Sequence, residues 1–296
     1  MTSRKPFNLL NRIFGTPVSA ARSESAALAS LLGLAWVVEA RDPYTGGHLW
    51  RVSRYATLLA EAAGLSSQEI ALTTIGGFLH DLGKIAIPDA ILRKSDRLTD
   101  DEYEIIKTHP EVGRNLIARH PFGHLVMDAV YGHHERPDGK GYPVGLTKDA
   151  IPAMSAIIGI CDAFDAMTSA RPYRKAMTVE AALQILRANL GTQFHNEYGD
   201  LFLRLGRDYN FHHIVEHSDD GIPLQHCVTC GPTIVVRSGT QTGEQIFCPA
   251  CGTGYRFEDK LKPITLTGSK ATASDLVQEP DGALIAKLLD RLPYAT

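Results

Sequence analysis

The chain has 296 residues, of which 44% are hydrophobic and 21% charged, and its net charge at pH 7 is −3. This composition is typical of a soluble globular protein with one large domain or two smaller ones. The slight acidic excess argues against a nucleic-acid binder, which would usually carry a basic excess. Five cysteines are too few for a disulfide-rich secreted fold, so we expect a reducing, cytoplasmic compartment.

The N-terminal segment, residues 1–24, lacks the long apolar core of a signal peptide, and we expect it to form an arm. The apolar run over residues 26–38 is followed directly by charged residues. Because a membrane span needs about 20 apolar residues, this run predicts a buried helix and no membrane span.

Helical periodicity dominates from residue 25 to about residue 210. Ser66 with Glu69, and Thr99 with Glu102, have the spacing of capping boxes, and Gly64 is placed as a helix C-cap. The expected helices cover residues 25–40, 49–63, 66–80, 99–107, 111–118, 125–131, 151–167 and 179–190. No alternating strand pattern of useful length precedes residue 225, so the sequence predicts an all-α domain over residues 25–210.

The character of the sequence changes near residue 225, where two CxxC pairs are separated by 17 residues: Cys227 and Cys230, then Cys248 and Cys251. This spacing favours a zinc ribbon, in which four thiolates hold one structural zinc ion, over a pair of redox-active CxxC motifs. The fifth cysteine, Cys161, is interpreted as a small buried hydrophobic residue.

The segments 233–237 and 244–247 resemble strands joined by a hairpin at residues 238–240. We therefore expect a small β module over residues 225–260. A polar tail, 261–296, follows and contains an amphipathic helix over residues 283–292, which docks on this chain or on a partner.

Seven groups with metal-ligating chemistry lie near predicted helix ends or, in one case, inside an apolar helix: His48, His80, Asp81, His109, His133, His134 and Asp162. A single buried histidine is usually structural. The whole set exceeds the needs of one ion and fits two ions that share a carboxylate. Imidazole and carboxylate suit Mn, Fe and Zn ions, and Lys84 adds a cation suited to phosphate.

Four blocks of this sequence resemble the HD-GYP family of the HD phosphohydrolase superfamily. They are residues 42–52 (DPYTGGHLWRV), 80–84 (HDLGK), 133–143 (HHERPDGKGYP) and 162–174 (DAFDAMTSARPYR). The resemblance covers roughly residues 25–205. It implies an all-α domain that hydrolyses the bacterial second messenger cyclic di-GMP to pGpG, GMP or both. Iron or manganese is the expected metal, with a hydroxide held between two ions.

The resemblance also implies a role for each matching residue. One ion would be bound by His48, His80, Asp81 and Asp162, and Asp81 would bridge to a second ion bound by His109, His133 and His134. Lys84 would contact the scissile phosphate or the hydroxide. Tyr142, Arg171 and Arg174 would bind the substrate, and Gly141 would shape the loop that supplies Tyr142. Some family members bind a third ion through a Glu four residues before the first His; Tyr44 stands there, so two ions are expected.

Two alternatives to this enzyme stay open. The domain could be a slow or inactive sensor of cyclic di-GMP that signals through the C-terminal ribbon, or a phosphohydrolase for another nucleotide. A protein partner for the ribbon or for the C-terminal helix, and a homodimer, are also left open by the sequence.

Overall fold

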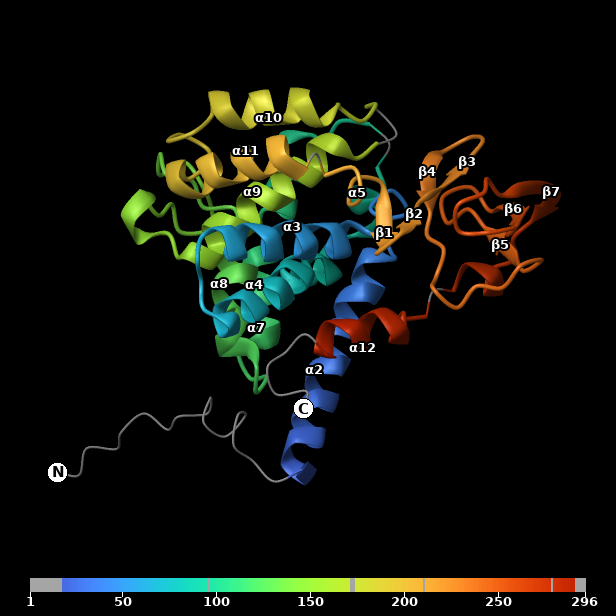
Figure 1. Cartoon of the computed structure of the whole chain (residues 1–296), viewed down its shortest axis with the longest axis horizontal. Coiled ribbons are helices and arrows are strands. Elements are labelled where there is room, and N and C mark those ends of the chain that lie inside the picture. Colours follow the sequence, from blue (N-terminus) through green and yellow to red (C-terminus); the bar gives the residue numbers. More distant parts are fainter. Residues whose placement is uncertain (1–17, 95, 171–173, 210, 278, 291–296) are drawn as a thin grey trace.

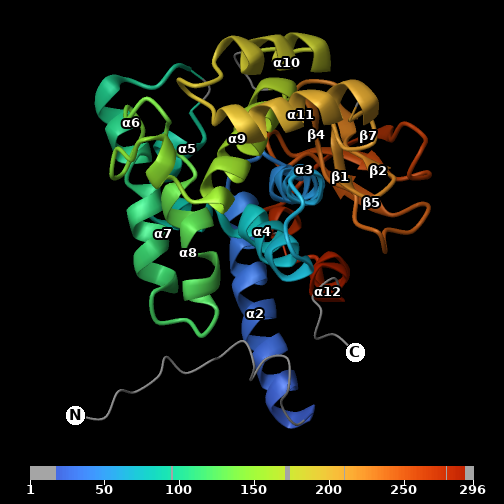
Figure 2. The same ribbon diagram turned by 60° about the vertical axis from the view of Figure 1, so that its left-hand side comes forward.

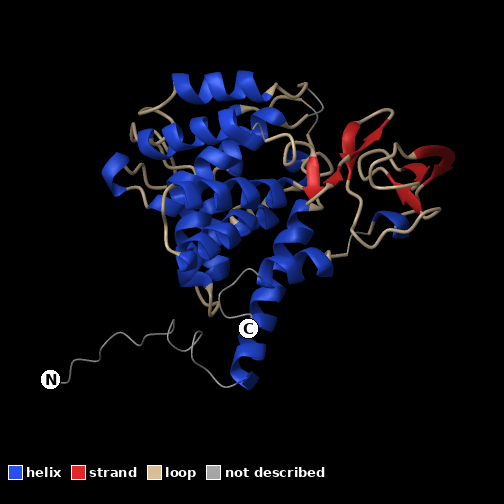
Figure 3. Cartoon of the chain, viewed as in Figure 1, coloured by secondary structure: helices blue, strands red, loops and turns tan. Residues whose placement is uncertain are grey.

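The computed structural model describes residues 18–94, 96–170, 174–209, 211–277 and 279–290, with side chains from Ser25 onward. Within these residues a large helical body is followed by small sheets, which Figure 1 and Figure 3 show at one side of the body. The prediction of a mainly α chain with a C-terminal β region is confirmed. In the described part of the chain, no helix has the length and apolarity needed to cross a membrane.

Most helices of the body match predicted segments, but the first begins at Val18 instead of residue 25, and the helices at Asp89–Leu92 and Asn196–Tyr209 were not predicted. The helices of the body are α2 (Val18–Glu39), α3 (His48–Ala62), α4 (Ser67–Leu79), α5 (Asp89–Leu92), α6 (Asp100–Ile106), α7 (His109–Ile117), α8 (Gly123–Gly132), α9 (Ala153–Thr168), α10 (Val179–Ala188) and α11 (Asn196–Tyr209). Short 3₁₀ helices η1 (Leu82–Ala86) and η2 (Lys148–Ala150) lie between them, and η3 (Ser274–Leu276) lies in the tail. Both predicted capping boxes are present, at Ser66 and Thr99, which explains why these helix starts were readable from the sequence.

The centre of the body is an aromatic cluster that joins α3, α9 and α11. The ring of Tyr55 lies 5.2 Å from Phe164 and 6.1 Å from Phe202, centroid to centroid, both edge to face. Phe211, just after α11, packs against the same rings, and all four side chains are fully buried. Edge-to-face aromatic pairs add to the free energy gained by burying their area. The cluster therefore fixes α3 relative to α9, and these helices carry two of the predicted metal ligands, His48 and Asp162.

The described residues after α11 form three small antiparallel sheets. The strands are β1 (His217–Asp219), β2 (Ile222–Pro223), β3 (Gln225–Cys227), β4 (Gly231–Ile234), β5 (Gln245–Phe247), β6 (Thr253–Arg256) and β7 (Thr265–Lys270). They pair as β1–β2, β3–β4 and β5–β6–β7. The predicted hairpin at residues 238–240 is wrong, because β4 pairs back with β3 and β5 pairs forward with β6. Each CxxC pair thus forms the turn of its own hairpin.

Two further elements of this region depend on contacts that are distant in sequence. Strand β7 is polar and exposed, and it is held by its pairing with β6, so the sheet continues past the expected boundary at residue 260. Helix α12 (Gly282–Asp290) packs on α2 and buries Leu284, Ile285 and Leu288. Figure 2 shows α12 beside α2, on the side away from α7 and α8. Docking of this helix on its own chain is therefore confirmed.

Candidate metal centre

The predicted ligands come together because five helices end or pass at one place. His48 begins α3, His80 and Asp81 follow α4, and His109 begins α7. His133 and His134 follow α8, while Asp162 lies within α9. The close approach of η1 to α7 requires Gly83, because a Cβ there would lie 1.8 Å from the carbonyl oxygen of His109. This glycine allows Asp81 and His109 to share one site.

Three of the histidines are oriented by backbone carbonyls. Nδ1 of His80 lies 2.7 Å from the oxygen of Gly77, Nδ1 of His109 lies 2.7 Å from that of Ile106, and Nδ1 of His133 lies 2.8 Å from that of Ala129. A carbonyl only accepts hydrogen bonds, so Nδ1 must be the donor in each ring. In the neutral imidazole the lone pair is then on Nε2, the nitrogen that faces the other ligands.

The Nε2 atoms that face one another cannot form good hydrogen bonds with each other, but their lone pairs could bind a cation between them. Nε2 of His109 lies 3.2 Å from Nε2 of His133, and Nε2 of His48 lies 3.4 Å from Nε2 of His80. In the first pair both Nδ1 atoms are donors, so two lone pairs point at each other, which is unfavourable unless a positive charge lies between them. Potential ligand atoms within 4.8 Å of one another form three overlapping groups: His109, His133 and His134; His48, His80 and Asp162; and His80, Asp81 and His133.

Asp81 lies between the two histidine pairs. Its Oδ1 is 3.4 Å from Nε2 of His109, whereas its Oδ2 is 3.4 Å from Nε2 of His80 and 3.5 Å from Nε2 of His48. Burial raises the pKa of Asp81, but Lys84 and the nearby histidines outweigh burial and hold that pKa well below its usual value. The carboxylate is therefore ionised and has one oxygen directed to each side, the position of a bridging ligand.

Burial keeps most of the imidazoles neutral. It lowers the pKa of His109 to about 4 and that of His134 to about 3, and the pKa of His133 also falls well below its usual value. Neutral imidazole is the form that binds metals. Burial also lowers the pKa of His48, but hydrogen bonds to Asp165 and Asp81 outweigh it and raise that pKa to about 9. The carboxylates that attract a proton to His48 would equally attract a cation.

A cleft opens beside these ligands, and its lining is rich in cations. His109, His133, His134 and Asp162 line its floor, and the basic residues along it are Lys84, Lys107, Arg136 and Lys140. Nζ of Lys84 donates to Oδ2 of Asp81 at 2.5 Å. This arrangement suits a substrate with several negative charges.

Tyr142 covers part of the cleft from the loop after α8. Its ring stacks on that of His134 with 4.6 Å between the centroids, and Nζ of Lys107 lies 5.6 Å from the centroid of the Tyr142 ring. Gly141 allows this close approach, since a Cβ there would lie 2.4 Å from the backbone nitrogen of Arg136.

Of the two predicted substrate-binding arginines, the structure describes the position of only one. Arg171 lies outside the described residues. Arg174 donates through Nη2 to the carbonyl of Ala166 on α9, and it is not among the described residues that line the cleft.

Three residues that contact the site indirectly were not among the predicted site residues. Asp165 accepts from Nδ1 of His48 at 2.8 Å, and Arg51 donates to both oxygens of Asp165. Glu135, 7% exposed, accepts from the backbone nitrogens of residues 144, 145 and 146 and so closes the loop that carries Tyr142. A carboxylate inside the apolar helix α9 and a Glu within a Gly/Pro-rich loop were the available sequence signals.

The four C-terminal cysteines meet at the turns of their two hairpins. Their sulfur atoms all lie within 4.8 Å of one another, and Sγ of Cys227 is 3.6 Å from Sγ of Cys251. Tetrahedral zinc with thiolates at about 2.3 Å requires neighbouring sulfurs roughly 3.8 Å apart. The hydroxyl of Tyr255 and the backbone nitrogen of Thr229 both donate toward Cys227. Cys161, by contrast, is buried alone in α9, and burial raises its pKa well above the usual value.

Comparisons with known proteins agree with the geometry of the helical body. A family model described as "HD domain" matches residues 34–197, which include all seven predicted ligands. The cyclic di-GMP phosphodiesterase response regulator RpfG of Xanthomonas campestris is 43% identical over 177 residues, covering 59% of this chain and 47% of that protein. A cyclic di-GMP phosphodiesterase of Thermotoga maritima is 37% identical, covering 57% and 47%, respectively.

One similar protein is named for a different cyclic dinucleotide. The 3'3'-cGAMP-specific phosphodiesterase 3 of Vibrio cholerae is 37% identical over 162 residues, covering 54% of this chain and 35% of that protein. The chain thus spans about half, or less, of the length of these curated relatives.

Proposed function

Because the chain belongs to the HD domain family, we propose that it is a metal-dependent phosphodiesterase that hydrolyses cyclic di-GMP to pGpG, GMP or both. The observation that carries the proposal is the position of Asp81, with one oxygen toward His109 and the other toward His80 and His48, beside a cationic cleft. A carboxylate shared by two sets of imidazoles is the protein framework that a two-metal phosphoryl-transfer site requires.

The residues divide into two ligand sets that share this carboxylate. We assign His48, His80, Asp81 and Asp162 to one ion, and Asp81, His109, His133 and His134 to the other, with iron or manganese as the metal. Two divalent ions held by these residues would lower the pKa of water, so that a hydroxide nucleophile is available at neutral pH, and would neutralise charge on the phosphate.

The remaining residues of the cleft bind and orient the substrate. Lys84, fixed by Asp81, presents its ammonium to the phosphate next to the metal ligands. Lys107, Arg136 and Lys140 attract the second phosphate electrostatically. Burial raises the pKa of Tyr142, so its hydroxyl stays protonated as a hydrogen-bond donor while its ring offers a face on which a base can stack.

The decisive experiment is product analysis with defined metals. The purified chain would be loaded with Mn(II), or anaerobically with Fe(II), and incubated separately with cyclic di-GMP and 3'3'-cGAMP, because relatives named for each substrate are similar to this chain. Asp81→Ala should abolish turnover, and Asp101→Ala, an exposed carboxylate on α6, should not. If the chain hydrolyses 3'3'-cGAMP but not cyclic di-GMP, the proposed substrate is wrong and 3'3'-cGAMP takes its place. Tight binding without hydrolysis under either metal would favour a sensor over an enzyme.

For the C-terminal region we propose that Cys227, Cys230, Cys248 and Cys251 hold one structural zinc ion in a ribbon-like module that docks a protein partner. We propose the helical body, residues 25–210, and this module, from residue 225, as separate units between an N-terminal arm and a polar tail. The pairing of β7 with β6 supports extending the module to Lys270. One zinc ion per chain by elemental analysis, lost on replacing a cysteine, would support the zinc assignment; a zinc-free module of the same stability would overturn it.

A further inference from the structure

Arg51 is a buried arginine whose guanidinium connects two parts of the molecule. Its side chain is 2% exposed and lies on α3, one turn after His48. Nε and Nη2 donate to the two oxygens of Asp165 at 2.6 and 3.0 Å. On the other side, Nη1 donates to the carbonyl oxygens of Gly46 and His217 at 2.9 and 3.0 Å. The planar guanidinium is suited to such divided contacts, which a single ammonium cannot reproduce.

Asp165 links Arg51 to the candidate metal centre by a hydrogen bond to His48. Its Oδ2 accepts from Nδ1 of His48 at 2.8 Å, so the carboxylate fixes both the tautomer and the ring orientation of a predicted ligand. The hydroxyl of Ser169 is 3.1 Å from Nη2 of Arg51 and 3.3 Å from Oδ2 of Asp165, which closes the group. A shift of the guanidinium would therefore turn the imidazole of His48 away from the other ligands.

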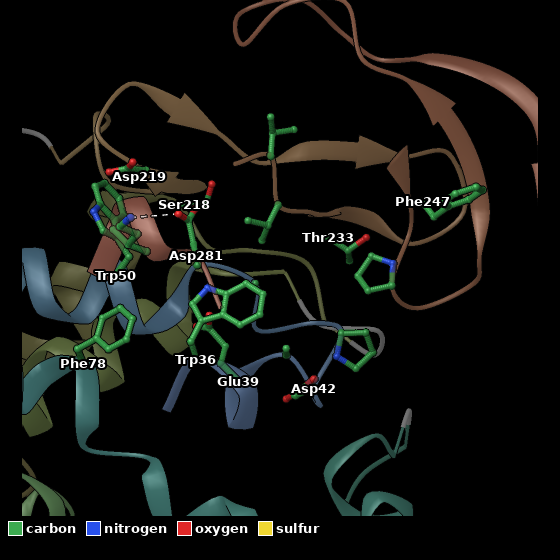
Figure 4. A pocket seen from close by; sticks show the side chains of 18 residues that line it. Trp36, Glu39, Asp42, Trp50, Phe78, Ser218, Asp219, Thr233, Phe247 and Asp281 are labelled. Atoms are coloured by element: carbon green, nitrogen blue, oxygen red, sulfur yellow. Dashed lines mark hydrogen bonds between the residues drawn. The ribbon is translucent and has the colours of Figure 1, made fainter. Parts of the chain in front are cut away.

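The carbonyl that holds Arg51 comes from the C-terminal region. His217 is the first residue of β1 and lies beyond residues 34–197, which match the HD domain family. The β1–β2 hairpin is joined to the module through Ile222, which packs with Val236 and Phe257. Figure 4 shows Ser218 and Asp219 of β1 next to Trp50 of α3, at the cavity between the module and the helical body. The β1–β2 hairpin, which packs against the module, thus reaches the metal centre through the carbonyl of His217.

We propose that Arg51 is a positioning residue through which the C-terminal sheets hold His48 in its ligating orientation, the carbonyl of His217 fixing Arg51, Arg51 fixing Asp165, and Asp165 fixing His48. This inference rests on the proposed metal-dependent function. The C-terminal sheets then help to position a metal ligand. Displacement of β1 should therefore lower the affinity for the ion bound by His48 more than the affinity for the ion bound by His109, His133 and His134.

Binding of Mn(II) to the full chain, followed by the electron paramagnetic resonance signal of free Mn(II), tests the inference without substrate. Mn(II) prefers nitrogen and oxygen ligands, so the thiolate site does not interfere. Arg51→Lys keeps the positive charge but cannot reach Asp165 and His217 together. Loss of a ligand's own hydrogen-bond partner typically weakens metal binding by about 10- to 100-fold. Arg51 acts one step further away, through Asp165, so we expect one of two Mn(II) sites to weaken by up to that range and the other to remain.

The matched control is Arg54→Lys. Arg54 also lies on α3 and contacts the same hairpin, with Nε 3.5 Å from Oδ1 of Asp220. It should leave both Mn(II) affinities unchanged. If Arg51→Lys preserves both affinities, whatever its thermal stability, the inference is overturned.

A second variant tests the hairpin end of the contact and covers the case in which Arg51→Lys does not fold. Gly47 has φ 74°, and a Cβ there would lie 2.8 Å from the carbonyl oxygen of His217 and 3.0 Å from Nη1 of Arg51. Gly47→Ala should weaken the same Mn(II) site, and its effect should not add to that of Arg51→Lys. Unchanged affinities in Gly47→Ala, or fully additive effects, would overturn the inference.

The two proposals fail in different ways. A wild-type chain that binds two Mn(II) ions but hydrolyses no cyclic dinucleotide would remove the proposed function and leave the Mn(II) comparison valid. A wild-type chain that binds no Mn(II) would remove both.

Discussion

Replacing Glu135 by Gln should open the loop that carries Tyr142 without touching the metal ligands. The carboxylate of Glu135 accepts from the backbone nitrogens of Val144 at 2.7 Å and Gly145 at 3.2 Å through Oε1, and from Leu146 at 2.7 Å through Oε2. Glutamine has almost the same shape but only one acceptor oxygen. If that oxygen faces Val144 and Gly145, the amide NH₂ must face the N–H of Leu146, so two donors meet.

The size of the effect follows from this mismatch. A buried donor left without an acceptor costs about 1–3 kcal/mol. For a domain of this size, a loss of about 2 kcal/mol lowers Tm by roughly 4–8 °C. If the loss instead opens the loop locally, the same energy weakens substrate binding, because 1.4 kcal/mol corresponds to about a tenfold change in affinity. Tyr142 then loses its stacked position on His134.

Thermal unfolding and steady-state kinetics with cyclic di-GMP would measure both consequences. We expect Glu135→Gln to lower Tm, to raise KM by roughly tenfold, or both, while the metal content stays at the wild-type level. Glu111→Gln is the control, because this side chain is 41% exposed on α7 and the surface ion pair with Arg114 that it loses is worth only about 0–1 kcal/mol. A Glu135→Gln variant with wild-type Tm and KM would refute the reasoning.

Three further substitutions test other parts of the molecule. Asp81→Asn removes the shared charge and should reduce bound Mn(II) below two per chain and turnover by about 10²- to 10³-fold, which elemental analysis and product assays would show; two retained ions would contradict its bridging position. Tyr142→Ala should lower kcat/KM for cyclic di-GMP by about 5- to 150-fold, the value of one stacked base, but affect a simple aryl phosphodiester much less; equal losses would count against base stacking. Cys248→Ser should lower the zinc content and make residues 225–270 the first site of limited proteolysis, whereas an unchanged cleavage pattern would argue against a structural ion.

Much of the candidate metal centre could be predicted because several of its ligands are adjacent in the sequence. Doublets such as His80–Asp81 and His133–His134 are adjacent in the chain, and each falls at a helix end marked by a cap or a glycine. The positioning groups were harder to recognise. Arg51 and Asp165 are 114 residues apart, and Arg51 and His217 are 166 apart, so no local pattern joins them.

In the C-terminal sheets, too, the sequence predicted the side-chain chemistry but not the long-range backbone pairing. The cysteine spacing predicted a site of four thiolates, and the four sulfurs do meet. The pairing of the strands was not predictable from the segment between the two CxxC pairs, because each hairpin closes around its own CxxC turn. Strand β7 carried no apolar alternation, since its exposed residues are held by backbone hydrogen bonds to β6.

For this protein, the sequence by itself determined the helical class, the starts of the capped helices, and the identity of the groups able to bind metal. These properties depend on side-chain chemistry and on periodicity over a few residues. Only the tertiary structure decided that Asp81 lies between two histidine pairs, that Glu135 closes the loop of Tyr142, and that the carbonyl of His217 reaches Arg51. These contacts form when helices and strands distant in the sequence pack together. That packing depends on how all the core side chains fit against one another, and no local sequence pattern shows it.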